Sequence, residues 1–201
     1  MPAPIDFYFD FSSPYGFMAS EKIDAVAATH GRGVRWCPVL LGVVFKQTGA
    51  APLTQIPLKG DYSRRDMVRS ARYHGIDGFR MPSKFPIPSQ AAARIVLWAG
   101  QQDGALAGRV VHALYRAYFV DDIDISDPEN AIAVAAKCGI DPAAARAAID
   151  DPAIKDALRR GNEEAIAKGV FGSPYIVVDG EPFWGMDRLD QVQRWLATGG
   201  W

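Results

Sequence analysis

The sequence predicts an α/β fold whose sheet is assembled from both ends of the chain, with a large helical insertion between them. A strand–helix–strand pattern occupies residues 5–39, and two short strands followed by a helix occupy residues 175–196. The segment between them carries one helical pattern after another and no strand pattern. With 201 residues, 49% of them hydrophobic and 22% charged, the chain can bury one sizeable core or two closely packed lobes.

The first strand is predicted at residues 5–11, IDFYFDF, which are mostly β-branched or aromatic and alternate in part between apolar and polar. Pro14 ends this pattern. Apolar positions then recur at helical spacing from residue 15 to about residue 30, and a GRG sequence separates this helix from a second strand at residues 34–39. These elements form a βαβ unit, whose crossover we expect to be right-handed.

The middle of the chain predicts helices only. Residues 50–88 are rich in proline, glycine and basic residues, with a short helical pattern around residues 64–74. Further helices are predicted at residues 91–100, 105–120 and 153–168. An aspartate directly precedes a proline at three places, where the aspartate is Asp127, Asp141 or Asp151. This is the pattern of an N-cap residue followed by proline at the first helical position.

The end of the chain returns to strand patterns. Residues 175–178, YIVV, predict a strand, and residues 182–184 predict a second strand that returns beside it. Asp179-Gly180 between them predicts a type I′ turn. Residues 188–196 predict a final helix.

Together these patterns predict a thioredoxin-like fold with a large helical insertion, because a βαβ start and a ββα end supply the two halves of such a sheet. The thioredoxin-like domain is discontinuous, at residues 1–45 and 169–201, and the helical insertion domain spans residues 46–168. No internal repeat or low-complexity segment interrupts this layout.

The charge balance limits the class of ligand. Twenty-two basic and 23 acidic residues leave a net charge of -1, so the sequence offers no overall attraction to nucleic acid or anionic lipid. No segment approaches the roughly 18 consecutive apolar residues of a membrane span, and the N-terminus has no basic stretch followed by a long apolar run. We therefore expect a cytoplasmic protein that binds neither nucleic acid nor membrane.

The cysteines and histidines predict neither a metal site nor a redox site. Cys37 and Cys138 lie far apart, with no CxxC motif and no nearby histidine cluster, so we expect both to be reduced and partly or wholly buried. His30, His74 and His112 share no motif, which gives no support to a Ser-His catalytic pair.

The first candidate site is FDFSSPYGFMAS, residues 9–20, where a strand passes through a proline-bearing turn into a helix. Thiol-handling folds place their reactive cysteine at such a junction, and Ser13 stands there in this chain. The free N–H groups and the positive dipole end of the helix would lie near its hydroxyl, which favours an anion. The alternative is an ordinary N-cap serine before proline. Ser12 is interpreted as a polar residue at the strand end.

The second candidate site is GVFGSPY, residues 169–175, where Ser173-Pro174 directly precedes a strand. A cis bond here would free the N–H and C=O of Ser173 from the strand ladder, so that they could pair with an extended peptide. The alternative is a trans proline that opens an edge strand.

Charged residues supply two further candidates. Asp187, at the entrance to the last helix, is either a helix cap or a carboxylate that binds an ammonium group. Lys59, in the sequence IPLKGDY, is either a solvated surface lysine or a cation for a ligand carboxylate. The nearby arginines are predicted to form a solvated helix face: Arg64, Arg65, Arg69 and Arg72.

Three stretches of the chain, FYFDFSSPYGFMAS, PLKGDY and GVFGSPYIVVDGEPFWGMDRL, resemble the 2-hydroxychromene-2-carboxylate isomerases and the kappa-class glutathione transferases. The resemblance covers nearly the whole chain and is strongest at both ends, where the motifs agree in order and spacing. It implies a DsbA-like arrangement, in which a helical domain interrupts a thioredoxin fold, and it implies a homodimer.

The resemblance also implies a binding site for glutathione. Ser13 matches the serine that hydrogen-bonds the glutathione sulfur, and Pro14 and Tyr15 complete that turn. Lys59 matches a lysine that contacts glutathione.

The C-terminal motifs match the rest of that site. Ser173 matches the residue before a cis-proline, here Pro174, and the backbone at this point pairs with the cysteinyl unit in the family. Met186 and Asp187 match the pair of residues that receives the γ-glutamyl end.

The activity that the resemblance implies is glutathione-dependent isomerisation of 2-hydroxychromene-2-carboxylate or a related aromatic catabolite, with Ser13 as the catalytic residue. A hydroxyl donor and a helix N-terminus would stabilise the thiolate of glutathione, whose thiol has an unperturbed pKa of about 8.5. The thiolate would add to an electron-poor double bond, permit rotation and be expelled again, so that glutathione is a regenerated cofactor.

Three positions depart from the family pattern. Ala50 stands where kappa-class relatives carry an asparagine that contacts glutathione, and Pro88 stands where we expect an asparagine. Phe45 lies near the position of a substrate-binding lysine, with Lys46 adjacent. These differences concern the identity of the aromatic substrate more than the binding of glutathione.

Two other functions remain open. One is a kappa-class-like glutathione transferase or peroxidase, which would consume glutathione. The other is a non-catalytic, DsbA-like protein that binds extended peptides at Pro174. A redox protein is nearly excluded, because the positions of a C-x-x-C motif hold Ser13-Pro14-Tyr15-Gly16 and one serine cannot exchange disulfides.

Overall fold

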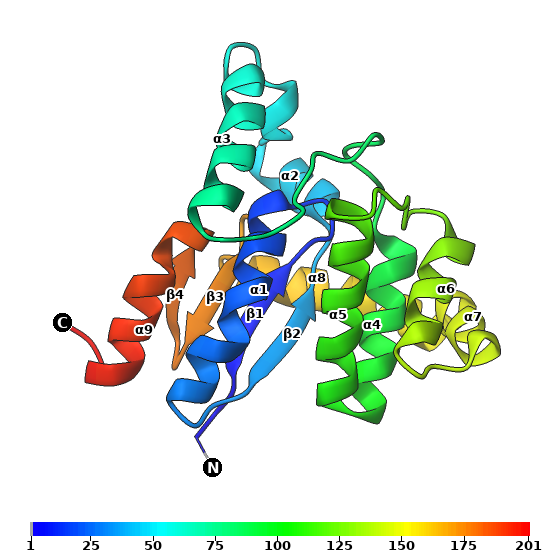
Figure 1. The fold of residues 1–201 in the computed structure, drawn as a ribbon. Coiled ribbons are helices and arrows are strands. Elements are labelled where there is room, and N and C mark those ends of the chain that lie inside the picture. The colour runs from blue at the N-terminus through cyan, green and yellow to red at the C-terminus, as the bar shows by residue number, and fades with distance from the viewer. Residues whose placement is uncertain (1) are drawn as a thin grey trace.

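The central sheet combines strands from both ends of the chain, as the sequence predicts. In the computed structural model, which describes residues 2–201, the strands are β1 (Ile5–Phe9), β2 (Val34–Pro38), β3 (Tyr175–Val178) and β4 (Glu181–Trp184). Within this part of the chain they form one sheet in the order β2-β1-β3-β4 (Figure 1). β1 runs parallel to β2 and antiparallel to β3, so the two halves of the sheet meet at β1.

The hairpin between β3 and β4 has the predicted turn. Asp179 and Gly180 both have positive φ angles, 52° and 91°, which a type I′ turn requires at its two central positions. The turn aligns Tyr175 with Trp184 across the two strands. The prediction from Asp179-Gly180 is confirmed.

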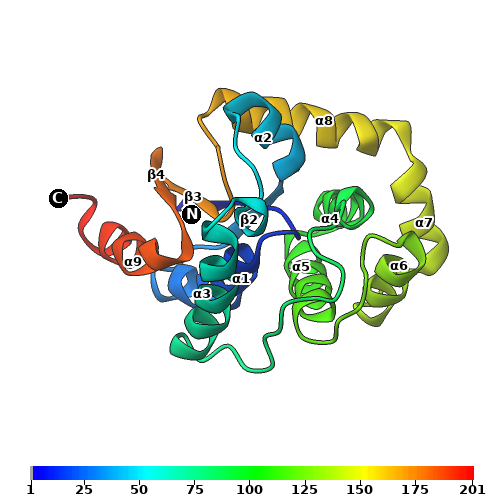
Figure 2. The same cartoon turned by 90° about the horizontal axis from the view of Figure 1, so that it is seen from above.

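Helices cover both faces of the sheet (Figure 2). On one face lie α1 (Pro14–Thr29) and α9 (Leu189–Thr198), and on the other lie α2 (Leu41–Thr48) and α8 (Pro152–Ala167). A small buried cluster joins the second face to the residues around α8: Tyr8, Val39, Ala165, Val170 and Tyr175. The layers therefore enclose the sheet as a thioredoxin-like layout requires.

The helical insertion forms a bundle beside β2, built from α4 (Gln90–Gln102), α5 (Gly104–Phe119), α6 (Pro128–Lys137) and α7 (Pro142–Asp150). The three Asp-Pro sequences correctly predict the starts of α6, α7 and α8. The side chains of Asp127, Asp141 and Asp151 each accept a hydrogen bond from a backbone N–H in the first turn of the helix that follows. Such caps typically contribute about 1 kcal/mol each.

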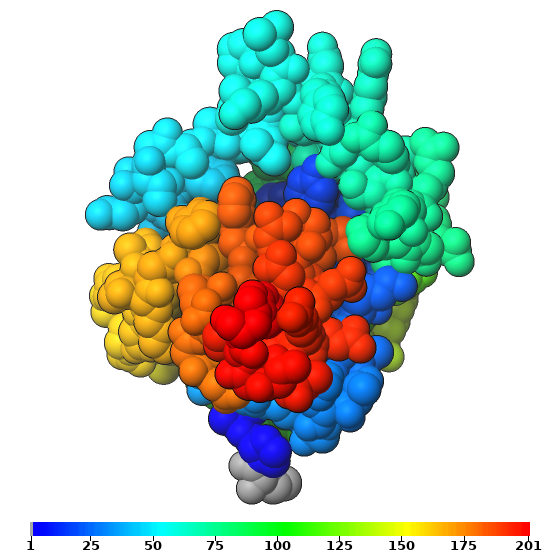
Figure 3. All heavy atoms as spheres, turned by 90° about the vertical axis from the view of Figure 1, so that its left-hand side faces the viewer, coloured from blue at the N-terminus to red at the C-terminus, as the bar shows by residue number. Residues whose placement is uncertain are grey.

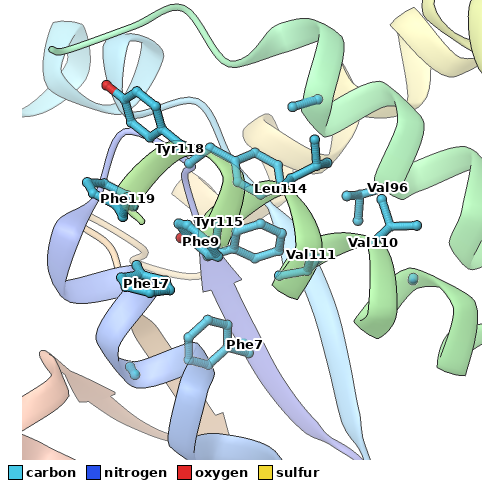
Figure 4. Packing of buried hydrophobic residues seen from close by; sticks show 14 of the residues in the cluster. Phe7, Phe9, Phe17, Val96, Val110, Val111, Leu114, Tyr115, Tyr118 and Phe119 are labelled. Atoms are coloured by element: carbon cyan, nitrogen blue, oxygen red, sulfur yellow. The ribbon is translucent and has the colours of Figure 1, made fainter. Parts of the chain in front are cut away.

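The main core lies where α5 packs on α1 and β1. Its largest fully buried side chains include Phe9, Phe17, Tyr115 and Phe119 (Figure 4). The rings of Phe9 and Tyr115 lie 5.7 Å apart, and those of Phe17 and Phe119 lie 5.4 Å apart. Because one continuous core joins the insertion to the sheet, α5 fixes the end of β1 in place.

The structure differs from the prediction between residues 41 and 73. The sequence pattern did not predict α2, and α3 (Lys59–Tyr73) begins before the predicted residue 64. Two short 3₁₀ helices, η1 (Leu53–Gln55) and η2 (Met186–Arg188), were also missed. No side chain within α2 marks its start, because its first amides bond to side chains that lie far away in the sequence.

The division into residues 1–45 with 169–201 and residues 46–168 stays a prediction, although α2 begins at Leu41, inside the first of these segments. Cys37 and Cys138 are free and partly buried, as expected. Burial raises the pKa of the Cys37 thiol to about 12, which makes it an unreactive group. None of the helices in residues 2–201 is long and apolar enough to span a membrane.

Candidate functional site

Ser13 lies at the start of α1, and its hydroxyl makes two hydrogen bonds. Its Oγ accepts from the N–H of Gly16 at 3.0 Å, which confirms the N-cap interpretation. The same hydroxyl donates to the backbone carbonyl of Ser173 at 2.8 Å. The side chain is almost completely buried in the protein alone. Ser13 and Ser173, which were predicted separately from opposite ends of the sequence, therefore lie in contact.

The Ser173–Pro174 peptide bond is cis, one of the two possibilities that the sequence left open. The bond between Phe85 and Pro86 is also cis, which the sequence analysis did not predict. The backbone N–H of Ser173 has no hydrogen-bond partner within residues 2–201. An unpaired N–H beside the Ser13 hydroxyl is a donor that an extended peptide can use.

The chain folds back from Pro174 to the last helix through Gly185. The N–H of Gly185 donates to the carbonyl of Pro174 at 3.0 Å, which holds the segment that contains Met186 and Asp187 beside the cis bond. Met186 is buried in the main core. Its side chain therefore has a packing role, and only its backbone could contact a ligand.

Asp187 is exposed and pairs with Arg188 at 2.6 Å. Neither η2 nor α9 has a side-chain cap, so the alternative in which Asp187 caps the last helix is wrong. Asp187 is a carboxylate at the surface that a ligand ammonium could reach by displacing Arg188.

Lys59 is the first residue of α3, and it too is exposed. The residue before it, Leu58, has φ 66° and ψ -45°, and the N–H of Lys59 donates to the carbonyl of Pro57 at 2.8 Å. This is a γ-turn with positive φ, a rare and strained conformation for leucine. The leucine side chain is 96% exposed, so packing of that side chain does not compensate for the strain. The turn fixes where Lys59 enters α3.

Tyr15 connects the Ser13 turn to α3. Its hydroxyl donates to Asp66 at 2.6 Å, and Arg69 lies against the same carboxylate. The hydrogen bond from Tyr15, together with Arg69, holds the pKa of Asp66 below its ordinary value although burial acts in the other direction. The arginines of this helix face solvent as predicted. Tyr15 thus anchors the helix that carries Lys59.

Replacing Tyr15 by phenylalanine is expected to lower the free energy of unfolding by about 1 kcal/mol at neutral pH. The pKa of Asp66 is lower in the folded state than in the unfolded state. Its stabilising contribution is therefore complete above the unfolded-state value and is lost as the pH falls through the folded-state value. Urea unfolding of both proteins should show a difference that shrinks as the pH is lowered from about 7 to about 3. A difference independent of pH would contradict this role.

One side of the molecule is hollowed. Figure 3 shows the hollow between the cyan segment that contains α2 and η1 and the orange segment that contains β3 and β4, with blue residues of the N-terminal part visible inside. Lys59 in α3 and Asp187 in η2 make no hydrogen bond to Ser13 among the residues that the structure describes. The structure therefore joins Ser13 and Ser173 directly and leaves two opposite charges exposed on separate elements.

Two residues at the centre of this site were not predicted. Asp10 is a buried carboxylate at the end of β1, and its backbone carbonyl accepts from the N–H of Ser13 at 2.9 Å. The fully buried Tyr115 donates to the same carbonyl at 2.9 Å. An acidic residue inside the aromatic sequence FYFDF was the available signal for Asp10. Tyr115 belongs to an apolar helix pattern that gives no such signal.

Comparison with known proteins places the chain in a family. The family of DSBA-like thioredoxin domains matches residues 4–197. The chain belongs to this family. The predicted DsbA-like fold, a thioredoxin fold with a helical insertion, is thereby confirmed.

Two kinds of enzyme are among the proteins most similar to this DSBA-like chain. A 2-hydroxychromene-2-carboxylate isomerase of Sphingobium xenophagum is 30% identical, over 98% of this chain and 99% of its own length. The glutathione S-transferase kappa 2 of Caenorhabditis elegans is 27% identical, over 96% of this chain and 91% of its own. A solved structure of a 2-hydroxychromene-2-carboxylate isomerase superposes with a TM-score of 0.86 at 27% identity, covering 96% of this chain and 94% of the other.

The three departures from the family pattern lie in α2, just after it, or next to a residue that Ser12 contacts. Phe45 is half-buried in α2, Lys46 beside it is exposed, and Ala50 follows the end of the same helix. Pro88 is exposed, next to Ile87, whose carbonyl accepts from Ser12 at 2.7 Å. Ser12 is occupied by this contact, which agrees with its interpretation as a structural residue.

Proposed function

We propose that this DSBA-like protein is a glutathione-dependent isomerase that acts on 2-hydroxychromene-2-carboxylate or a related aromatic catabolite. The observation that carries the proposal is the contact between the Ser13 hydroxyl, at the N-terminus of α1, and Ser173, whose N–H has no partner in residues 2–201. Relatives with isomerase and glutathione transferase activity over nearly the whole chain support it.

The residues present fit glutathione. The unpaired N–H of Ser173 suits the carbonyl of the cysteinyl unit, in the manner of an added strand. Exposed Lys59 offers a cation for a carboxylate, and exposed Asp187 offers an anion for the ammonium of the γ-glutamyl end. Glutathione is zwitterionic at its γ-glutamyl end and anionic at its glycine end, so both charges are needed.

Binding requires the Ser13 hydroxyl to change its acceptor. It has one proton, and that proton is donated to the carbonyl of Ser173. When the hydroxyl rotates toward a sulfur, the carbonyl of Ser173 becomes free to accept from the cysteinyl N–H. Each lost hydrogen bond is thereby replaced, and the rotation leaves no buried group unpaired.

The Ser13 turn would hold the thiol of glutathione as a thiolate, the nucleophile that adds reversibly to a carbon–carbon double bond of the substrate and so allows it to rotate. The hydroxyl of Ser13 would donate one hydrogen bond to the negative charge, and the N-terminus of α1 would add its dipole. Each lowering of the thiol pKa by one unit corresponds to about 1.4 kcal/mol. In this role glutathione would be a regenerated cofactor and not a consumed substrate.

The test follows both substrate and glutathione. The protein is incubated with glutathione and 2-hydroxychromene-2-carboxylate, and isomerisation is recorded together with the remaining thiol. Turnover with undiminished glutathione supports the isomerase. Stoichiometric loss of thiol, with this substrate or with hydroperoxides and other electrophiles, supports a kappa-class-like transferase or peroxidase instead.

Calorimetry decides between these enzymes and the peptide-binding alternative. A non-catalytic peptide-binding protein would bind unfolded peptides and would not bind glutathione. The homodimer and the cytoplasmic location stay predictions of the resemblance and of the sequence.

A further inference from the structure

Asp10 is a buried acidic residue that the proposed reaction does not use. It follows β1 directly, and only 4% of its surface is exposed. Burial raises the pKa of its carboxyl, while hydrogen bonds from its neighbours oppose that rise. A buried carboxylate is costly unless hydrogen bonds satisfy it, so its retention here calls for a physical reason.

The three groups that donate to this carboxylate come from the starts of three helices. Oδ1 accepts from the N–H of Ser12 at 2.8 Å, just before α1, and from the hydroxyl of Ser89 at 2.7 Å, the N-cap residue of α4. Oδ2 accepts from the N–H of Leu41 at 2.6 Å, the first residue of α2. All three donors are uncharged, and helix N-termini carry partial positive charge, so they stabilise the anion together.

The backbone of Asp10 contacts both halves of the proposed glutathione site. Its carbonyl accepts from the N–H of Ser13 at 2.9 Å, and its N–H donates to Oγ of Ser173 at 3.1 Å. One residue therefore links the two serines to the helices α2 and α4, which belong to different parts of the fold.

We propose that Asp10 is the positioning residue of the glutathione site, because its carboxylate holds the Ser13 turn in a fixed orientation against α2 and α4. The inference rests on the proposed function. It assigns to Asp10 no contact with glutathione or with the substrate. Its effect is transmitted through the orientation of the Ser13 hydroxyl.

Only a carboxylate satisfies this arrangement. An asparagine at position 10 has one acceptor oxygen and one NH₂ group in nearly the same shape. If its oxygen faces Ser12, the NH₂ meets the N–H of Leu41, and if it is flipped, the NH₂ meets the N–H of Ser12. In both orientations two N–H donors face each other, so the hydrogen bond to either Ser12 or Leu41 must break.

The experiment compares Asp10→Asn with the wild-type protein in binding reduced glutathione. Affinity is measured by calorimetry, and the pKa of the bound thiol is measured from its thiolate absorbance in the ultraviolet. We expect about tenfold weaker binding and a higher thiol pKa, because a displaced Ser13 donates poorly to the sulfur. Removing a nearby negative charge would by itself lower the thiol pKa. A rise in the thiol pKa therefore indicates that Ser13 is displaced, whereas a fall indicates only the loss of the Asp10 charge.

Two further variants keep the test decisive. Val134→Ala removes buried atoms in α6, away from the site, and serves as the control for lost stability. Leu41→Pro removes the backbone donor to Oδ2 and leaves the Asp10 carboxylate itself unchanged, although it also replaces the partly buried leucine side chain. Proline is tolerated at this first helical position, and the residue before it, Leu40, is in an extended conformation. If Asp10→Asn does not fold, Leu41→Pro is expected to weaken glutathione binding about threefold and to raise the thiol pKa.

A thiol pKa that is unchanged or lowered in the folded variants overturns the inference. So does a loss of affinity equal to that of Val134→Ala. If the wild type does not bind glutathione, or if Ser13→Ala binds it equally well, the proposed function itself fails. If Ser13→Ala weakens binding and Asp10→Asn does not, only the role of Asp10 is wrong.

Discussion

Replacing Ser13 by alanine is expected to weaken glutathione binding by ten- to hundredfold, and to raise the pKa of the bound thiol by about one to two units. A hydrogen bond to a charged group contributes about 1.5 to 3 kcal/mol, and Ser13 is the side chain whose hydroxyl faces Ser173 at the helix start. Isomerase turnover should fall at least as much, because the thiolate is the nucleophile. Calorimetry and thiolate absorbance against pH measure the two effects separately.

Ser12→Ala is the matched control for this experiment. The hydroxyl of each serine makes two hydrogen bonds. That of Ser12 donates to the carbonyl of Ile87 and accepts from the N–H of Ile87. The control should therefore lose about 1 to 2 kcal/mol of stability and keep its affinity for glutathione. Ser13→Ala also loses its N-cap, worth about 1 kcal/mol, so comparison with Ser12→Ala removes the general effect of lower stability. Equal affinities in Ser13→Ala and the wild type would exclude Ser13 from the site.

The elements that the sequence predicted correctly are those with local causes. Asp127-Pro128, Asp141-Pro142 and Asp151-Pro152 each place a cap and a proline at one helix start, and Asp179-Gly180 determines one turn. A cap bonds within its own first turn, so neighbouring residues contain all the information. The parallel pair of β1 and β2 and the hairpin of β3 and β4 follow similarly from neighbouring segments, whereas the pairing of β1 with β3 joins the two ends of the chain.

The parts that were missed depend on contacts between distant residues. α2 starts where the amides of Leu40 and Leu41 bond to Asn162 and Asp10, and neither partner is near them in the sequence. The contact between Ser13 and Ser173 likewise joins the two ends of the chain. The sequence predicted both serines as candidates, but it could not predict that the hydroxyl of one donates to the carbonyl of the other.

Replacing Gly16 by alanine is expected to destabilise the protein by about 2 kcal/mol and to weaken glutathione binding, although helix propensity alone predicts the opposite sign. A Cβ at this position would lie 2.6 Å from the hydroxyl oxygen of Tyr115 and 2.8 Å from Oγ of Ser173. Both distances are too short for non-bonded atoms. Tyr115 is fully buried and bonded to the Asp10 carbonyl, so it cannot move aside without breaking that bond.

Gly161→Ala in α8 is the control, because a Cβ there meets no atom within 4 Å. With no clash, only helix propensity acts, and this variant should gain about 0.5 to 1 kcal/mol. Urea unfolding of the two variants should therefore give changes of opposite sign. Glutathione affinity should fall for Gly16→Ala alone, because the added methyl group pushes on Ser173. A stable Gly16→Ala protein with wild-type affinity would show that the space between the two serines and Tyr115 is not constrained as the structure indicates. Ser173 would then be free to move, and a rigid arrangement of Ser13 and Ser173 could no longer explain how the site stabilises a thiolate.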